Sequence, residues 1–191
     1  IDEIKNIINE IQPDFIFHLA AQPIVSLSYN DPIETLSTNI MGTANLLEVL
    51  RLLQKPCIAI IITSDKCYDN VEWEWGYRET DMLGGHDSYS ASKAASDRMS
   101  SSMAFELREH GVTVLTIYPG LVRTESVLAG ADFLDLSNSE SPEFVGRAVV
   151  ALSRDKMVHQ KSGRVLATAE LAVEYDFTDS DGSCPAPFSF Q

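Results

Sequence analysis

The chain has 191 residues, 45% hydrophobic and 22% charged, which is typical of one soluble globular domain. Its formal net charge of −14 at pH 7 disfavours nucleic acids and anionic membranes as partners, because these polyanions would be repelled. Its three cysteines form no Cys-x-x-Cys pair and its apolar runs are short, which disfavours disulfide frameworks, zinc sites and membrane spans and favours a cytoplasmic setting.

The chain opens with a predicted helix followed by a short strand. Isoleucines recur at helical spacing from Ile1 to Ile11, and Pro13 ends that pattern. The chain starts without methionine inside this pattern, which indicates a fragment. Residues 14–20 then read as a buried strand. His18 within it is a packed core histidine rather than a metal ligand, because no second ligand lies at a suitable spacing. No metal site is expected.

A long helix is predicted over residues 34–53, after a polar connection at 23–32. Its apolar face is wider than contact with one sheet requires. The surplus face suggests a partner helix, with simple burial in the core as the alternative.

Two apolar runs predict neighbouring buried strands. Residues 57–62 end abruptly at the polar stretch 63–66, and residues 112–118 end at Pro119 and Gly120. Open α/β sheets bind their ligands at the carboxyl ends of their strands, so both runs point to a site at one edge.

Tyr89 and Lys93 lie four residues apart near the start of a predicted helix that Gly111 closes. At this spacing both side chains lie on one helical face, one turn apart. The ammonium lowers the cost of forming tyrosinate, so the phenol could exchange a proton with a substrate near neutral pH. The alternative is an accidental pair on a solvated surface, because short motifs match cheaply.

The remaining segments complete the predicted domain. The aromatic segment 69–87 faces substrate or packs its two tryptophans over the domain edge. Ser141, Pro142 and an early acid start a helix that runs to about residue 152. The last strand, the domain and a poorly ordered tail are expected at residues 163–168, 1–175 and 176–191.

Together these segments resemble the short-chain dehydrogenase/reductase superfamily. Residues 4–93 resemble its extended branch, most closely the CDP-glucose 4,6-dehydratases, through residues 17–23, 38–48, 63–68 and 75–79. Residues 94–182 resemble the shorter single-domain branch, through residues 106–112, 119–125 and 162–166. The two resemblances meet at the tyrosine–lysine helix, which suggests a mosaic, natural or engineered.

The resemblance implies an α/β fold with a Rossmann-like, doubly wound parallel sheet, of which this chain supplies strands four to seven. The ten glycines do not form the Gly-rich pyrophosphate loop that belongs to the first strand of that family. Strand 14–20 would then be an apolar edge that a preceding segment, a second copy or a rearranged helix must cover.

The resemblance also implies residue roles. Tyr89 would be the acid/base, Lys93 would tune it and hold the cofactor ribose, and Ser64 would orient the substrate oxygen. Asn39 would hold the local backbone and a water beside the lysine. Asp65 and Lys66 would assist loss of water, with an Asx-type turn capped by Asp65 as the alternative. The remaining cofactor-binding positions, in addition to Tyr89 and Lys93, are Leu19, Ala20, Ala21, Pro119, Gly120, Val122 and Thr124.

Three functions follow. The first is an NAD- or NADP-dependent oxidoreductase acting on an alcohol or carbonyl compound through Ser64, Tyr89 and Lys93. The second is a nucleotide-sugar 4,6-dehydratase using the same three residues. The third is a non-catalytic, truncated or chimeric half-domain that self-associates, since cofactor binding normally requires the Gly-rich loop. Dimers of the resembled family pair the two long helices, so a homodimer is expected.

Overall fold

The computed structural model describes residues 1–67 and 85–187, apart from the side chain of Asp65. Within these residues one four-stranded parallel sheet runs in the order β1-β2-β3-β4. Its strands are β1 (Phe15–His18), β2 (Cys57–Ile62), β3 (Val112–Tyr118) and β4 (Val165–Ala167). The sequential order and the parallel pairing confirm the predicted Rossmann-like α/β fold.

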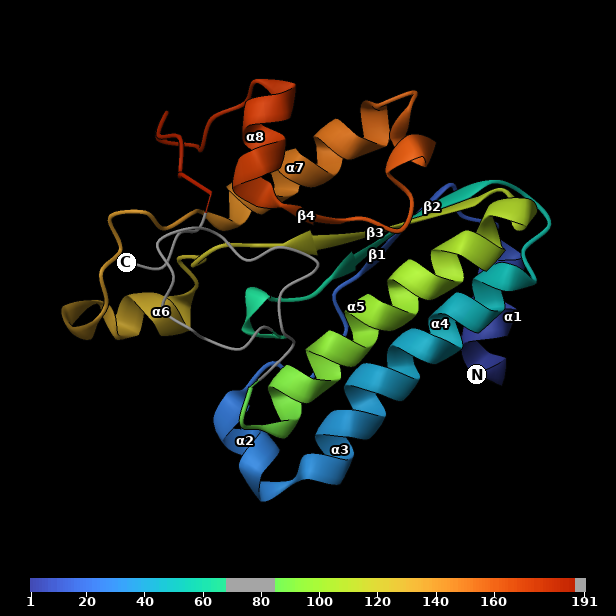
Figure 1. The fold of residues 1–191 in the computed structure, drawn as a ribbon, viewed down its shortest axis with the longest axis horizontal. Coiled ribbons are helices and arrows are strands. Elements are labelled where there is room, and N and C mark those ends of the chain that lie inside the picture. The colour runs from blue at the N-terminus through green and yellow to red at the C-terminus, as the bar shows by residue number, and fades with distance from the viewer. Residues whose placement is uncertain (68–84, 188–191) are drawn as a thin grey trace.

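Helices cover both faces of the sheet (Figure 1). One face carries α1 (Asp2–Ile11), α4 (Gly42–Arg51) and α5 (Ser88–Leu107), and the other carries α7 (Pro142–Arg154) and α8 (Thr168–Tyr175). Shorter helical segments connect them: α2 (Val25–Asn30), α3 (Pro32–Leu36), η1 (Ser37–Met41), η2 (Asp65–Cys67), η3 (Arg108–His110), α6 (Glu125–Ala129), η4 (Ala131–Phe133) and η5 (Val158–Lys161). No helix in the described ranges has both the length and the apolarity needed to cross a lipid bilayer.

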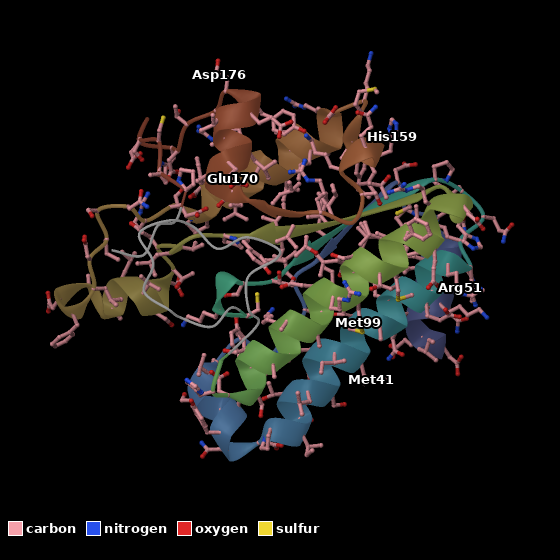
Figure 2. All side chains as sticks on the ribbon, in the orientation of Figure 1. Met41, Arg51, Met99, His159, Glu170 and Asp176 are labelled. Atoms are coloured by element: carbon pink, nitrogen blue, oxygen red, sulfur yellow. The ribbon has the colours of Figure 1, made fainter. Side chains whose placement is uncertain are left out.

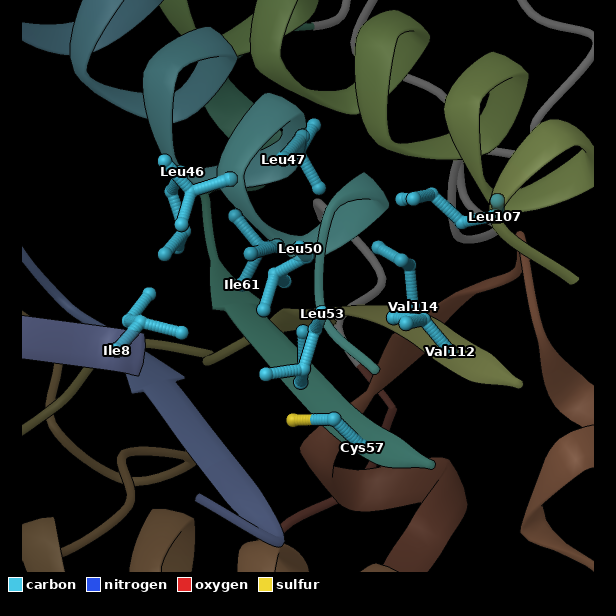
Figure 3. Packing of buried hydrophobic residues seen from close by; sticks show 13 residues of the cluster. Ile8, Leu46, Leu47, Leu50, Leu53, Cys57, Ile61, Leu107, Val112 and Val114 are labelled. Carbon is cyan, nitrogen blue, oxygen red and sulfur yellow. The ribbon is translucent and has the colours of Figure 1, made fainter. Parts of the chain in front are cut away.

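Successive side chains of β2 point to opposite faces of the sheet, so the hydrophobic core has two halves. Cys57, Ala59 and Ile61 face the α4 side, where leucines of α4 point towards them (Figure 3). Ile60 faces the opposite side and packs with Leu152 of α7. Because both faces of the strand are buried, its sequence is continuously apolar rather than alternating.

Strand β1 lies at the edge of the sheet. Ile16 and His18 turn towards α4, whereas Phe15 and Phe17 stack with ring centroids 6.5 Å apart on the opposite face. These two rings remain 38% and 47% exposed. No further strand pairs with β1 in the described part of the chain, so what covers this edge stays a prediction.

The structure differs from expectation in three helical regions. The polar connection at 23–32 contains the short helix α2, and α8 follows β4 directly. The long helix predicted over 34–53 is present, but the π-helical segment η1 interrupts its α-helical hydrogen bonding. The chain leaves α8 at Asp176, which is labelled in Figure 2.

Candidate active site

Helix α5 starts where its first turn can be capped. The Asp87 carboxylate accepts a 2.8 Å hydrogen bond from the backbone N–H of Ser90 and a 3.0 Å bond from its hydroxyl. Gly85 precedes this cap with φ +118°, and a Cβ there would lie 2.3 Å from the Ser90 Cβ. Glycine is therefore required, and the cap places Tyr89 in the first turn of α5.

Tyr89 and Lys93 are both buried, with only 8% and 6% of their surface exposed. The Lys93 ammonium lies 5.6 Å from the centre of the Tyr89 ring and donates a 3.4 Å hydrogen bond to the Ile62 carbonyl. Burial lowers the pKa of Lys93, and the Asp97 carboxylate opposes this change. The predicted pair is thus a buried unit and not the solvated surface pair considered as the alternative.

Asn39 joins α5 to the carboxyl end of β1. Its Oδ1 accepts a 2.7 Å bond from the Gln22 N–H, and its Nδ2 donates to the Gln22 carbonyl at 3.2 Å and to Ser92 Oγ at 2.8 Å. It lies within the π-helical segment η1 and is 2% exposed. Two of these bonds hold the backbone at Gln22, and the third reaches Ser92 on α5. The role that the resemblance implies for this asparagine beside the lysine stays a prediction.

A cavity of about 10 Å³ lies beside the lysine, which is room for one water molecule. His18 also reaches it and lies 3.1 Å from the Thr43 hydroxyl, and burial followed by the charge of Lys93 lowers the His18 pKa. Its lining joins the ends of β1 and β2 to η1, α4 and α5: His18, Ala20, Ala21, Asn39, Thr43, Ile61, Ile62, Thr63, Lys93 and Ser96. The structure therefore brings Asn39, Ala20, Ala21 and Lys93 together.

Of the predicted residues after β2, Ser64 lies in the turn that leads to η2, and Asp65 and Lys66 lie in η2 itself, which packs against α5. Ser64 is half-buried, and its hydroxyl accepts a 3.3 Å hydrogen bond from the Lys66 N–H. The Lys66 side chain is exposed, and the Asp65 side chain lies outside the described part of the structure. The role of Ser64 in orienting the substrate oxygen and the acid/base roles of Asp65 and Lys66 stay predictions.

A buried carboxylate beneath this turn was not predicted. Asp97 is 6% exposed, accepts a hydrogen bond from the Tyr118 hydroxyl, and lies one turn beyond Lys93 on α5. Tyr118 also lies 2.9 Å from the Cys67 sulfur. Burial raises the pKa of Asp97 to about 6, although Thr63, Tyr118, Cys67 and Lys93 oppose the rise. Neither Asp97 Oδ1 nor Thr63 Oγ1 has a hydrogen bond of normal geometry to a described residue.

The predicted nicotinamide-facing segment follows β3. Pro119, Gly120 and Val122 are half-buried, and Thr124 is exposed at the start of α6, where its Oγ1 accepts a 3.4 Å bond from the Val127 N–H. The Thr124 hydroxyl proton remains available to a ligand. Leu19 is 68% exposed and does not line the cavity beside Lys93.

Glu140 contacts this segment through Gly120, and it was not among the predicted site residues. Its Oε1 accepts hydrogen bonds from the Gly120 N–H and, at 2.8 Å, from Thr168 Oγ1, whereas Oε2 has no described partner. Burial raises its pKa, although these hydrogen bonds oppose the rise. Asp97 could have been predicted from sequence, because it lies four residues after Lys93 on the same helix. Glu140 could not, because its partners Gly120 and Thr168 are distant from it in sequence.

The described residues contain no group of three or more His, Cys, Asp or Glu side chains arranged to hold a metal ion.

Comparison with known proteins identifies related chains. Residues 1–140 match the family model described as GDP-mannose 4,6 dehydratase. CDP-glucose 4,6-dehydratase from Salmonella typhimurium is 43% identical over 138 residues, which cover 69% of this chain and 37% of that enzyme. Dehydrogenase/reductase SDR family member 1 from Mus musculus is 41% identical over 107 residues, which cover 49% of this chain and 34% of that protein. The matches thus span little more than a third of these relatives.

The fold also matches a solved structure. RMD from Pseudomonas aeruginosa, solved in complex with NADPH, superposes with a TM-score of 0.65 and 24% sequence identity. The superposition covers 81% of this chain and 58% of that protein. It supports the fold independently of the sequence match.

Proposed function

Because this chain belongs to the GDP-mannose 4,6-dehydratase family, and so to the short-chain dehydrogenase/reductase superfamily as its sequence predicts, we propose that it carries the active centre of a nucleotide-sugar 4,6-dehydratase. The buried Tyr89–Lys93 pair is the observation that carries the proposal. The sequence alone favours a different function, an oxidoreductase that acts on an alcohol or carbonyl compound. The 43% identity to CDP-glucose 4,6-dehydratase favours the dehydratase instead and suggests a CDP-hexose substrate.

In this proposal Tyr89 removes the proton from a sugar hydroxyl as the alcohol becomes a ketone. Tyrosinate is normally costly at neutral pH, and the Lys93 ammonium 5.6 Å from the ring lowers that cost by direct charge attraction. Asp97 in turn favours the charged form of Lys93. Ser64 donates a hydrogen bond to the substrate oxygen, so the tyrosine and the serine together fix the reacting carbon.

The buried ammonium also fits a dinucleotide. Lys93 has three N–H donors but makes one hydrogen bond to a described residue, so two donors suit ribose hydroxyls. Ala20 and Ala21 leave the backbone open to close approach, while Val122 and Thr124 would meet the nicotinamide amide. NAD(P) supplies the hydride acceptor when it is bound.

Loss of water is the second half of the proposed reaction. Once the ring carries a ketone, the neighbouring C–H becomes acidic. One of the two polar groups after β2, Asp65 or Lys66, removes this proton while the other protonates the departing hydroxyl. Bound NAD(P) would supply the stored hydride to the carbon that lost its hydroxyl, and the residue that took the C–H proton would give a proton back to the neighbouring carbon. The sugar would then lose one water with no net change in the cofactor.

Two measurements on the pure chain test the proposal. NADH fluorescence should change with saturable binding, and incubation with CDP-glucose and NAD should give a product lighter by one water without net NADH. Saturable binding together with net NADH formation from an alcohol would instead favour the plain oxidoreductase, which the 41% match to Dehydrogenase/reductase SDR family member 1 also suggests. Absence of any binding would leave the non-catalytic half-domain.

Self-association belongs to the same proposal. Helices α4 and α5 lie side by side (Figure 1), and Met41 and Phe105 are 53% and 75% exposed near them. A second copy that packs against this pair would bury these side chains in a homodimer. Sedimentation analysis should give twice the chain mass, and Phe105→Asp should shift the equilibrium to monomer.

A further inference from the structure

Residues 177–187, which follow α8, form no helix or strand, yet they carry a carboxylate whose two oxygens both accept hydrogen bonds. Asp179 is 1% exposed. Its Oδ2 accepts from the Ser141 N–H at 2.8 Å and from the Arg123 guanidinium at 3.0 Å. Its Oδ1 accepts from the Ser180 N–H at 2.6 Å and from the Ser141 hydroxyl. The domain boundary predicted after residue 175 stays a prediction, but Asp179 ties residues beyond it to the domain.

The groups that Asp179 joins belong to two adjacent segments. Arg123 follows Val122 in the predicted nicotinamide-facing segment, and Ser141 caps α7. Between them the two backbones pair, because Glu140 N–H donates to the Leu121 carbonyl at 2.9 Å and Arg123 N–H donates to the Glu140 carbonyl at 2.8 Å. Asp179 therefore holds one end of this backbone pairing together, because it contacts Arg123 on one segment and Ser141 on the other.

Arg123 also links the two segments through contacts with Ser139. Its Nη1 donates to the Ser139 carbonyl at 2.7 Å and to the Ser139 hydroxyl at 3.0 Å, while Nη2 contacts Asp179. Charge-assisted hydrogen bonds of this kind are stronger than neutral ones. Rotation of residues 122–124 away from β3 would break them and leave the buried Asp179 carboxylate without its arginine, which is costly.

We infer that Asp179 is a positioning residue that holds residues 119–124 in a ligand-ready conformation, so that the segment after α8 governs affinity for the nicotinamide half of the cofactor. The effect on the cofactor rests on the proposed function, whereas the effect on residues 119–124 does not. Asp179 acts through Arg123 and Ser141 and does not itself reach a ligand.

The test compares two aspartates of the same segment. Asp179→Asn keeps the shape but removes the charge, and Asp181→Asn is the matched control, because the Asp181 side chain is 58% exposed and lies 3.8 Å from the same Arg123. Hydrogen–deuterium exchange of residues 119–124 should accelerate about tenfold or more in Asp179→Asn, as expected for loss of a charged hydrogen bond, and remain within about twofold in Asp181→Asn. NADH affinity should fall in parallel.

The outcomes separate cleanly. Equal exchange at 119–124 in the two variants overturns the inference, and so does acceleration spread evenly over β2 and α4, which would indicate general loss of stability. If the original chain does not bind NADH, the proposed function fails, but the exchange data still decide the positioning role. Should Asp179→Asn not fold, Arg123→Gln removes the same ion pair while Ser141 keeps its bonds, and the same exchange criterion applies.

Discussion

Among the residues that the structure describes, each side of the sheet buries one aspartate, and the two aspartates are held in opposite ways. Asp97, on the α5 side, is 6% exposed, and its Oδ1 has no hydrogen bond of normal geometry to a described residue. Asp179, on the α7 side, has both oxygens bonded and an arginine at 3.0 Å. Burial raises the pKa of Asp97 to about 6. For Asp179 burial also acts upward, but Ser141, Ser180 and Arg123 outweigh it and lower the pKa to about 2.

The difference separates a reactive environment from a structural one. The donors around Asp179 favour its ionised form, whereas burial of the incompletely bonded Asp97 beside Lys93 and Tyr118 raises its pKa to about 6. In the proposed function the α5 side carries the chemistry, and in our inference the α7 side carries the positioning. Four pairs of variants, one member on each side, sharpen this comparison.

The largest effect is expected from tyrosine substitutions. Tyr89→Phe removes the proposed proton-transfer group and should lower the rate of CDP-glucose dehydration by about 10²–10⁴-fold. Tyr175→Phe on α8 removes a hydroxyl that bonds to Asp155 at 2.6 Å and should leave the rate unchanged. Initial rates measured by mass spectrometry of the product decide. Similar losses in both variants would remove Tyr89 from the proposed mechanism.

We expect core packing to contribute similarly to stability on the two faces of the sheet. Leu50 of α4 and Leu152 of α7 are both fully buried, and replacing either with alanine should lower the free energy of unfolding by about 2–5 kcal/mol. Leu128→Ala is the control, because Leu128 is 50% exposed and little area is lost. Urea unfolding measures all three. A cost below about 1 kcal/mol on one side only would show that its core is loosely packed.

The pH dependence of stability should differ in sign between the two aspartates. The folded pKa of Asp97 lies above its ordinary 3.8, so ionisation destabilises the fold as pH rises from 3.8 to about 6, by about 3 kcal/mol relative to Asp97→Asn. The folded pKa of Asp179 lies below 3.8, so its stabilisation is present above that value and is lost as pH falls through about 2.

Urea unfolding from about pH 2 to about pH 7 tests both signs, with Asp132→Asn on an exposed aspartate as control. Each variant is compared with the unsubstituted chain at every pH. If the two differences in stability change in the same direction with pH, the contrast between Asp97 and Asp179 is wrong.

The smallest effects come from two glycines. Gly111 ends η3 with φ +73°, so Gly111→Ala should destabilise the fold by roughly 1–2 kcal/mol. Gly146 lies within α7 with open space around it, so Gly146→Ala should stabilise by about 0.5–1 kcal/mol. Thermal unfolding midpoints should therefore move in opposite directions. A lower midpoint for Gly146→Ala would indicate an unrecognised contact on that side.

Local sequence signals predicted much of the fold. β2 was placed from its uninterrupted apolar run, and the start of α7 from Ser141 and Pro142. Helix α2 was missed because six residues between prolines carry too little periodicity. Helix α8 was missed because it begins without a loop or a side-chain cap.

The same limit applies to the site. Tyr89 and Lys93 are neighbours on one helix, so spacing alone placed them on one face. Asp179 meets Ser141 across 38 positions and Tyr118 meets Asp97 across 21, contacts that only the folded sheet creates. Their burial and pKa shifts could not be read from the chain, because both depend on what packs around the carboxylates.

The π-helical segment η1 has a consequence for chain length. A π turn contains one more residue than an α turn, and Asn39 sits inside this widened turn. Deleting a single neighbour such as Ile40 would restore the tighter winding and move Asn39 to another position around the helix axis, which would take its amide away from Gln22. The position of this amide is thus encoded by a count of residues as well as by their identity, and an engineered shortening here would do more harm than most substitutions.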